Sequence, residues 1–415
     1  MTGWQEVTVF ELADSKRDSF NDGDWIEAPH ITTSGNRLLQ TGNIGVGRLL
    51  NRGTKRYVSD ASFRALKCKE LVPGDVLICR LAEPAGRACV VPDIGERRML
   101  TSVDVTIFRP NPSKADRRFL VAIFSTPEWF QDVTERCGGS TRTRIARSEL
   151  GKIKLRLPSI KAQTRIADAL TDADDVIAAL ERMISKKQAI KQGMSQQLLT
   201  GKTRLPGFVS RWSRSTVGEV SEVKTGPFGS ALHESDYVSR GTPIITVEHL
   251  GERGVEADRV PLVSDADRHR LRAYILQAGD VVFSRVGSID RSALVSDKEA
   301  GWLFSGRLLR VRFNPSRADP AFMSMQFHAR PFREAVRSVA VGQTMPSLNT
   351  GILRGIELDL PPIEEQRKIG SVLSDVDDEL DCLEVRLKKA RALKRGMMQQ
   401  LLTGRTHLAA SKGTL

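Results

Sequence analysis

The residues with the most evident capacity for catalysis are aspartates. A cluster of three carboxylates occurs twice at a constant offset of 203 residues: Asp172, Asp174 and Asp175, then Asp375, Asp377 and Asp378. Such clusters could bind Mg²⁺ and serve a nuclease. Both lie in stretches with helical periodicity, however, and successive positions on a helix spread around its axis instead of converging. We therefore predict a solvated or partner-facing acidic surface, with a metal site as the alternative.

Sequence signatures of other catalytic sites are missing. The chain has no GxxxxGK[ST] loop, so no nucleotide site of the Walker type is expected. The glycine-rich stretch 42–47 leads into no long helix, and we interpret it as a β-turn, with a phosphate-binding loop as the alternative. The Asn-Pro-Ser sequences at 111–113 and 314–316 lack the aromatic residue with which amino-methyltransferases hold a flipped base. Five scattered cysteines and six histidines show no metal-ligand spacing, so we expect no metal and no catalytic residue in this chain.

Basic and polar side chains on loop segments indicate a different chemistry, the binding of nucleic acid. The formal net charge is +13, an excess that attracts polyanions. Arginine can fork onto guanine, glutamine can pair with adenine, and either can contact phosphate alone. The candidates are Arg52, Lys55, Arg56, Arg80, Arg142, Arg144 and Arg147 in the first half, and His249, Arg253, Arg259, Arg268, Arg270, Arg272, Arg285, Gln343 and Thr344 in the second. A solvated surface charge is the alternative for each, and a structural role is the alternative for Arg80 and Arg285, which end matching strands.

These candidates must be positioned by a framework that is duplicated. Residues 157–205 align without a gap to residues 360–408, and each copy is predicted to be one long helix. Apolar residues recur at steps of four and three, the pattern of a coiled-coil seam. The seam residues are Ile166, Leu170, Ile177, Leu180 and Ile184 in the first copy, and Ile369, Leu373, Leu380, Leu383 and Leu387 in the second. We expect the two helices to pack on one another, with packing of each on its own domain as the alternative.

The seam is predicted to contain one irregularity. It lapses at Lys187 and Lys191, matched by Ala390 and Lys394. It is expected to restart at Ile190 and Leu393 and to run towards Met194, Leu198, Met397 and Leu401. Such a shift resembles a stutter, at which a supercoil locally unwinds.

The globular regions combine short β-type runs with turn signals and one or two helices. Repeated fragments at matching positions, such as Gly-Asp-Val at 74–76 and 279–281, show that the two regions share a frame although most of their content has diverged. We divide the chain into a first domain (1–156), a first spacer helix (157–204), a second domain (205–359), a second spacer helix (360–408) and a tail (409–415). No signal peptide or membrane-spanning run is visible, and a cytoplasmic protein with no membrane partner is expected.

The motifs carry a specific resemblance. The sequences LPSIKAQTRIADAL and LPPIEEQRKIGSVL open the two helices, and QQLLTG closes both. TGNIG stands in the first globular region, and GPFGSALHESDY and GDVVFSRVGS stand in the second. Together they resemble the DNA-specificity subunit of type I restriction–modification enzymes. Lys161-Ala162 replaces the acidic pair usual before Gln163, and LICRLAEPAG is a loose version of the sheet motif.

The resemblance implies an α+β fold with two tandem target recognition domains, twisted mainly-β cores, a pseudo-two-fold internal repeat and two antiparallel coiled-coil spacer helices. It implies that each domain reads one half of a split DNA site, and that the helices dock two methyltransferase subunits. Restriction subunits would join where they are encoded. Candidate docking residues are Gln163, Asp172, Asp175, Gln366, Asp375 and Asp378. S-adenosylmethionine, ATP and Mg²⁺ are expected in the partner subunits, and no cofactor is expected on this chain.

Two other functions are left open by the residues alone. One is a self-contained methyltransferase or nuclease, against which the missing motifs argue. The other is a stand-alone DNA-binding regulator or coiled-coil scaffold, which would need no methyltransferase partner.

Overall fold

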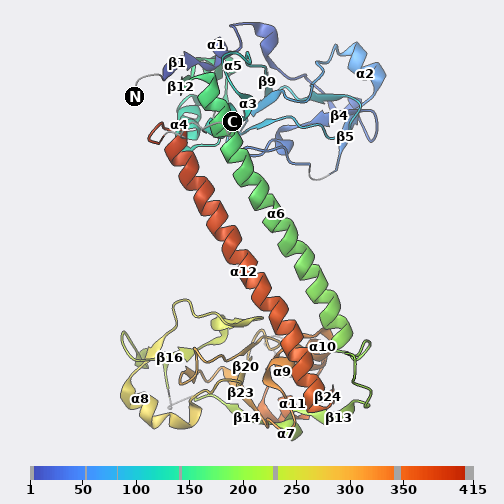
Figure 1. The fold of residues 1–415 in the computed structure, drawn as a ribbon, viewed down its shortest axis with the longest axis vertical. Helices are drawn as coiled ribbons and strands as arrows, with labels where there is room; N and C mark the ends of the chain where they lie inside the picture. The colour runs from blue at the N-terminus through green and yellow to red at the C-terminus, as the bar shows by residue number, and fades with distance from the viewer. Residues whose placement is uncertain are drawn as a thin grey trace, which may run out of the picture. The chain divides into compact units, whose positions relative to one another are not determined.

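The computed structural model describes residues 4–51, 54–81, 83–139, 143–227, 232–340 and 347–406 (Figure 1). The chain forms two compact units, the first made of Met1–Ala179 and Leu387–Leu415 and the second of Leu180–Arg386. Each unit contains one globular domain and a part of each long helix, α6 (Ile160–Leu198) and α12 (Ile363–Leu401). No helix among the described residues is long and apolar enough to cross a membrane.

The domain of the first unit is built on two four-stranded sheets. One has the order β2-β9-β6-β7 and is antiparallel throughout, whereas the other, β3-β5-β4-β8, contains one parallel pair, β4 with β8. The first and last strands of the domain, β1 and β12, pair with one another. The strands are β1 (Gln5–Thr8), β2 (Phe20–Asp22), β3 (Ile31–Thr32), β4 (Asn36–Leu39), β5 (Arg56–Val58), β6 (Val76–Cys79), β7 (Ala88–Val90), β8 (Met99–Thr101), β9 (Val105–Phe108), β10 (Cys137–Gly138), β11 (Arg144–Ile145) and β12 (Lys154–Leu157). The helices are α1 (Val9–Leu12), α2 (Asp60–Ala65), α3 (Arg117–Ile123), α4 (Pro127–Glu135) and α5 (Arg147–Lys152).

The domain of the second unit repeats this plan. Its sheets have the orders β14-β23-β20-β21 and β15-β19-β16-β22, the second again with one parallel pair, and β13 pairs with β24. The strands are β13 (Ser213–Thr216), β14 (Ser221–Thr225), β15 (Tyr237–Val238), β16 (Thr242–Ile245), β17 (Leu250–Gly251), β18 (Gly254–Val255), β19 (Leu262–Val263), β20 (Val281–Ser284), β21 (Ser292–Leu294), β22 (Leu303–Phe304), β23 (Leu308–Phe313) and β24 (Glu357–Leu360). The helices are α7 (Val217–Val220), α8 (Asp265–Arg270), α9 (Pro320–His328), α10 (Arg330–Val339) and α11 (Thr350–Gly355). The predicted fold class and internal repeat are thereby confirmed.

A buried glutamine fastens each domain to the helix that follows it. The Gln163 side chain accepts a hydrogen bond from the Asp116 N–H at 3.0 Å and donates to the carbonyls of Lys114 and Pro158. Asp116 in turn caps α3, because its carboxylate accepts from the N–H of Arg118. The repeated sequence NPS[KR]AD is therefore the turn on which the long helix is seated, as well as the start of a domain helix.

The two long helices run antiparallel within each unit. In the first unit, Ile166 and Leu170 of α6 share a core with Leu401 of α12, and Lys394 pairs with Asp174 at 2.5 Å. Positions that ascend along one helix therefore meet positions that descend along the other.

The second unit shows the same relation. Leu198 of α6 lies in one core with Ile369 and Leu373 of α12. Lys191 pairs with Asp377 at 2.5 Å, the counterpart of the pair between Lys394 and Asp174.

The predicted restart of the seam at Ile190 and Leu393 is wrong, whereas Leu198 and Leu401, further along it, are buried as predicted. Ile190 and Leu393 are 47% and 65% exposed. The lysines that interrupt the heptads are instead the residues that face the other helix, where Lys187 pairs with Glu379 and Lys191 with Asp377. Among the predicted seam residues, Ile166, Leu170, Leu180, Ile369, Leu373, Leu380 and Leu383 are buried, and Ile177, Ile184 and Leu387 are half-buried. Apolar contact thus gives way to paired charges along part of each helix.

Candidate nucleic-acid interface

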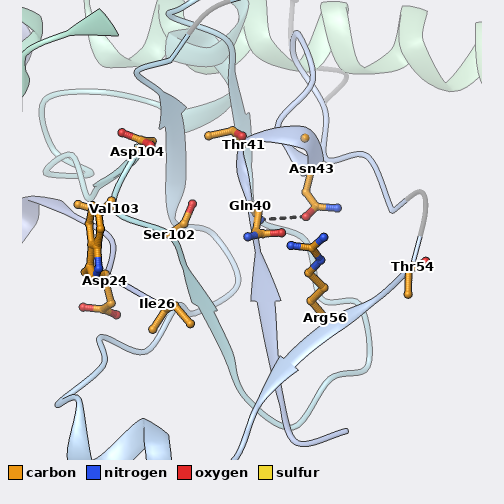
Figure 2. Close-up of a pocket in the computed structure, with 12 residues that line it drawn as sticks. Asp24, Ile26, Gln40, Thr41, Asn43, Thr54, Arg56, Ser102, Val103 and Asp104 are labelled. Atoms are coloured by element: carbon orange, nitrogen blue, oxygen red, sulfur yellow. Dashed lines mark hydrogen bonds between the residues drawn. The ribbon is translucent and has the colours of Figure 1, made fainter. Parts of the chain in front are cut away.

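A cleft of about 460 Å³ opens on the domain of the first unit (Figure 2). Four segments meet there: the chain leaving β2, the turn after β4, the start of β5, and the connection from β8 to β9. The lining residues are Asp24, Trp25, Ile26, Gln40, Thr41, Gly42, Asn43, Thr54, Arg56, Ser102, Val103 and Asp104. The cleft is thus rich in polar side chains and backbone.

The wall formed by the chain after β2 is held by backbone contacts. A Cβ at Gly23 would lie 2.3 Å from the Ser102 carbonyl oxygen, so only glycine allows this approach. The next residue, Asp24, donates its N–H to the Thr101 carbonyl at 2.8 Å. Its carboxylate accepts from both the backbone N–H and the ammonium of Lys69, at 2.8 and 2.6 Å. This wall is therefore set by the fold.

The turn after β4 places a glutamine beside an arginine. The turn is the 3₁₀ segment Thr41–Asn43, in which the Asn43 side chain accepts from the Gln40 N–H and donates to the Leu50 carbonyl. Asn43 is thereby used to hold the turn. Gln40 and Arg56 face one another across this part of the cleft in Figure 2. The sequence 42–47 is thus a structural turn, as predicted, although its first part is 3₁₀.

The other side of the cleft is backed by a network of arginines and aspartates. Arg144 lies 3.3 Å from the carboxylate of Asp104, and Arg80 lies 3.1 Å from that of Asp22. Arg147 donates to the side chain of Asn21 at 2.8 Å and also approaches Asp22. Arg144 remains exposed, whereas Arg147 is engaged with β2.

Arg80 is not available to DNA. Its guanidinium is buried and donates to the carbonyls of Val103, at 2.6 Å, and Ile145, at 3.3 Å. Burial lowers the pKa of this guanidinium, and the carboxylate of Asp22 partly offsets that effect. The structural alternative therefore holds for Arg80, and the proposed phosphate contact is wrong.

The remaining candidates of the first domain are Arg52, Lys55, Arg56 and Arg142. Lys55 pairs with Glu96 at 3.5 Å, and Arg56 is exposed on β5. Arg52 and Arg142 lie outside the described residues. Sequence reasoning missed Gln40 and Trp25. Each follows a strand, but no signal in the sequence shows that they share a cleft.

Two candidates of the second domain are structural. His249 is buried, and its Nδ1 lies 3.1 Å from the Thr246 N–H, where it holds the 3₁₀ turn Val247–His249. Arg253 pairs with Asp381 and Glu384 of α12, so it fastens the β17–β18 hairpin to the helix. Both side chains are engaged within their own unit. Burial makes the assignment of His249 to DNA wrong, whereas Arg253 is exposed and its DNA contact stays a prediction.

Other candidates of the second domain remain on the surface. Arg259, Arg268, Arg270 and Arg272 are exposed, and Arg270 pairs with Asp267 within α8. Arg285 directly follows β20 and is half-buried, and its backbone bonds to Arg307 and Leu348. Gln343 and Thr344 lie outside the described residues.

The two domains share the frame of the cleft and differ in the side chains on it. Thr246 and His249 stand where Gln40 and Asn43 stand in the first domain, with the same 3₁₀ turn between them. A Cβ at Gly226 would lie 2.1 Å from a serine carbonyl oxygen, as at Gly23. Equivalent backbone thus presents unlike chemistry in the two units.

The docking candidates divide into two groups. Gln163 and Gln366 are buried and fully hydrogen-bonded inside their units, so they cannot contact a partner, and this part of the prediction is wrong. The side chains of Asp172, Asp175, Asp375 and Asp378 are exposed. Within the described parts of the chain, no group of three or more histidine, cysteine, aspartate or glutamate residues could hold a metal ion.

Comparison with known proteins identifies the family. The sequence profile of the type I restriction modification DNA specificity domain matches residues 3–192 and, a second time, residues 210–390. The chain belongs to this family. It is a specificity subunit, the component that recognises DNA sequence in a type I restriction–modification system.

Individual relatives are distant in sequence. The specificity subunit of the type I restriction enzyme MjaVIII of Methanocaldococcus jannaschii is 20% identical over 325 residues, which is 75% of each chain. The putative MjaX specificity subunit of the same organism is 27% identical over 208 residues, 49% of this chain and 48% of its own.

Solved structures of the family share the fold. The S subunit of a type I restriction–modification system from M. genitalium superposes with a TM-score of 0.62 at 15% identity, covering 98% of this chain and 97% of that one. A chain from a structural study of assembly of the type I restriction–modification system gives a TM-score of 0.54 at 16% identity, over 97% and 98% of the two chains.

Proposed function

We propose that each domain of this specificity subunit reads one half of a bipartite, asymmetric DNA site, and that the paired helices carry the methyltransferase subunits. The observation that supports this is the duplicated cleft frame with different side chains on it. Gln40 and Arg56 stand on one domain, whereas Thr246 occupies the place of Gln40 on the other. One scaffold used twice with unlike reading residues fits a site whose halves differ in sequence.

The chain itself supplies no catalytic group in this proposal. S-adenosylmethionine, ATP and Mg²⁺ belong to partner subunits, and restriction subunits join the complex where they are encoded. The exposed aspartates of the two helices, Asp172, Asp175, Asp375 and Asp378, are the docking surface for the methyltransferase subunits. They recur at equivalent positions, so they suit two copies of one partner.

A domain exchange tests the division of reading between the two domains. Residues 206–352 are replaced by the corresponding segment of another family member, the protein is expressed with its methyltransferase, and methylated sites are mapped by sequencing. We expect one half of the site to change while the other half and the gap are kept. A change in both halves, or a continuous palindromic native site, would refute the proposal.

Charge substitutions test the docking surface separately. Asp172→Lys with Asp175→Lys, and the equivalent pair on the second helix, should each reduce co-purification of the methyltransferase while leaving the free chain folded. Equal recovery of the methyltransferase with all four substitutions would exclude these aspartates as the docking surface.

A further inference from the structure

The cleft of the first domain carries an exposed aromatic side chain, Trp25. Recognition of base edges by hydrogen bonds gives this side chain no role. Trp25 is 69% exposed, whereas Trp129 in the same domain is almost completely buried. Tryptophan is on average a highly buried residue, because its ring is large and apolar. An isolated exposed apolar residue can be ordinary surface, so the surroundings of Trp25 decide its meaning.

The backbone that carries Trp25 is constrained by the two residues before it. The preceding residues are fixed by the close approach of Gly23 to Ser102 and by three hydrogen bonds of Asp24. The indole N–H donates to the Glu27 carboxylate at 3.0 Å, which orients the ring. An exposed ring on a rigid backbone segment loses little conformational entropy when a binding partner covers it. Trp25 is therefore suited to anchor a ligand.

The neighbouring side chains define what that partner is. Gln40 and Arg56 line the same cleft, and among the described residues neither the Arg56 guanidinium nor the Gln40 amide group donates a hydrogen bond. The carboxylates of the cleft, Asp24 and Asp104, are each paired with a cation. The available groups are therefore a guanidinium, an amide and a π-face, which together match the edges and faces of nucleobases.

We propose that Trp25 is a wedge that enters a base step at the first half-site and stacks on one of its bases. The inference rests on the proposed function, since it assumes that this domain approaches DNA through the cleft. Inserted side chains partly unstack a step, and the cost is lowest at flexible pyrimidine–purine steps. The wedge thus adds to the selectivity of Gln40 and Arg56 by favouring sequences that open easily.

The second domain carries an aromatic residue at the matching sequence position. Phe228 follows Gly226 by two residues, as Trp25 follows Gly23. Phe228 lies outside the described residues, and the proposal concerns Trp25 alone.

The test uses the complete methyltransferase complex and the site found by methylation mapping. Trp25→Ala should weaken binding to the specific duplex about 10- to 100-fold, the effect of losing one base stack. Trp25→Phe keeps a π-face and should stay within about threefold of the unmodified protein. Val72→Ala is the matched control, because Val72 is also an exposed apolar residue of this domain but does not line the cleft.

Two further measurements separate a wedge from a structural role. Permanganate oxidises unstacked thymines, so a duplex with thymine at the opened step should become reactive with the unmodified protein and with Trp25→Phe, but not with Trp25→Ala. A single mismatch at that step removes much of the unstacking cost. It should therefore tighten binding by the unmodified protein several-fold and leave Trp25→Ala unaffected.

Several outcomes would overturn the inference. Equal binding by Trp25→Ala and the unmodified protein would do so, as would the absence of any Trp25-dependent thymine reactivity. Loss of methyltransferase association in Trp25→Ala, with DNA binding of the assembled fraction unchanged, would assign the ring to a protein contact instead. If the unmodified complex showed no preference for the mapped site over a shuffled duplex, the proposed function itself would fail, and this result is distinct from the others.

Discussion

Replacement of Gln366 by alanine should destabilise the second unit substantially. The side chain is 1% exposed and makes three hydrogen bonds: it accepts from the Asp319 N–H at 3.0 Å, and it donates to the carbonyls of Arg317 at 3.1 Å and Pro361 at 2.9 Å. Each buried polar partner left unsatisfied costs about 1 kcal/mol or more, and part of that is recovered if water enters the space. We expect a loss of about 2–4 kcal/mol in the free energy of unfolding of this unit.

The assay is urea unfolding of the free chain together with amide hydrogen exchange. Faster exchange should concentrate in the turn 314–319 and at the start of α12, since these are the segments that the glutamine joins. Gln163→Ala should have the same effect in the first unit, where the bonds are equivalent. Gln196→Ala, at an exposed position of α6, is the control and should change stability by less than about 0.5 kcal/mol.

One result would refute this reasoning. If Gln366→Ala unfolded like the unmodified chain but associated more weakly with the methyltransferase, the residue would be a docking contact, as predicted from the sequence. Gln366→Glu sharpens the comparison, because a carboxylate keeps the shape but cannot donate to the two carbonyls. It should be at least as destabilising as the alanine variant.

Three further predictions concern the seam, the charge and one histidine. Leu383→Asp should lower the free energy of unfolding by about 2–5 kcal/mol, because Leu383 is only 8% exposed. Leu393→Asp, at an exposed position, is the control and should lower it little. Equal losses in the two variants would show that the seam is misassigned. Binding of specific DNA by the assembled complex should weaken steeply between 50 and 200 mM salt, as counterion release requires, and an affinity that stays flat over this range would contradict an interface based on basic side chains. Burial lowers the pKa of His328, whose Nε2 lies 3.0 Å from the Ser292 carbonyl oxygen, so the unfolded chain takes up this proton more readily than the folded one. The contribution of His328 to stability is therefore present above about pH 6.5 and is lost as the pH falls. His328→Asn should make the unfolding free energy of the second unit less dependent on pH between about pH 7.5 and 5.5. An unchanged pH dependence would exclude His328 as its cause.

The sequence was informative about the helices and the duplication, because periodicity and repetition are properties of the chain itself. It could not show that Lys191 and Lys394, rather than Ile190 and Leu393, face the other helix, since an apolar residue near a heptad lapse is normally taken as seam. The rotation of each helix is set by the domain that holds it through a buried glutamine, and that contact spans about 50 residues of sequence.

The interface was predicted less well than the framework. Basic residues on loops were found, but Arg80 and His249 proved to be buried and Arg253 to be ion-paired, each within its own unit. Arginine and histidine serve hydrogen-bonded turns and ion pairs as readily as they serve DNA. Conversely, Gln40 and Trp25 come together only because the chain leaving β2, in one sheet, bonds to the end of β8, which lies beside β4 in the other sheet. No spacing in the sequence shows that these segments are neighbours.

The discontinuous make-up of the first unit has a consequence for synthesis of the chain. Its core includes Leu401 and Leu402 together with Ile166, and the ring of Trp4 lies against Gly404. These partners leave the ribosome about 200 residues after the rest of the unit, which is a delay of roughly 10–40 s at ordinary translation rates. During that interval the apolar residues at the start of α6 lack the α12 residues that bury them in the folded unit. The second unit is contiguous in sequence and can fold as soon as it has been synthesised. The domain made first is therefore the one completed last, and the newly made protein has its greatest need of chaperone protection near its own beginning.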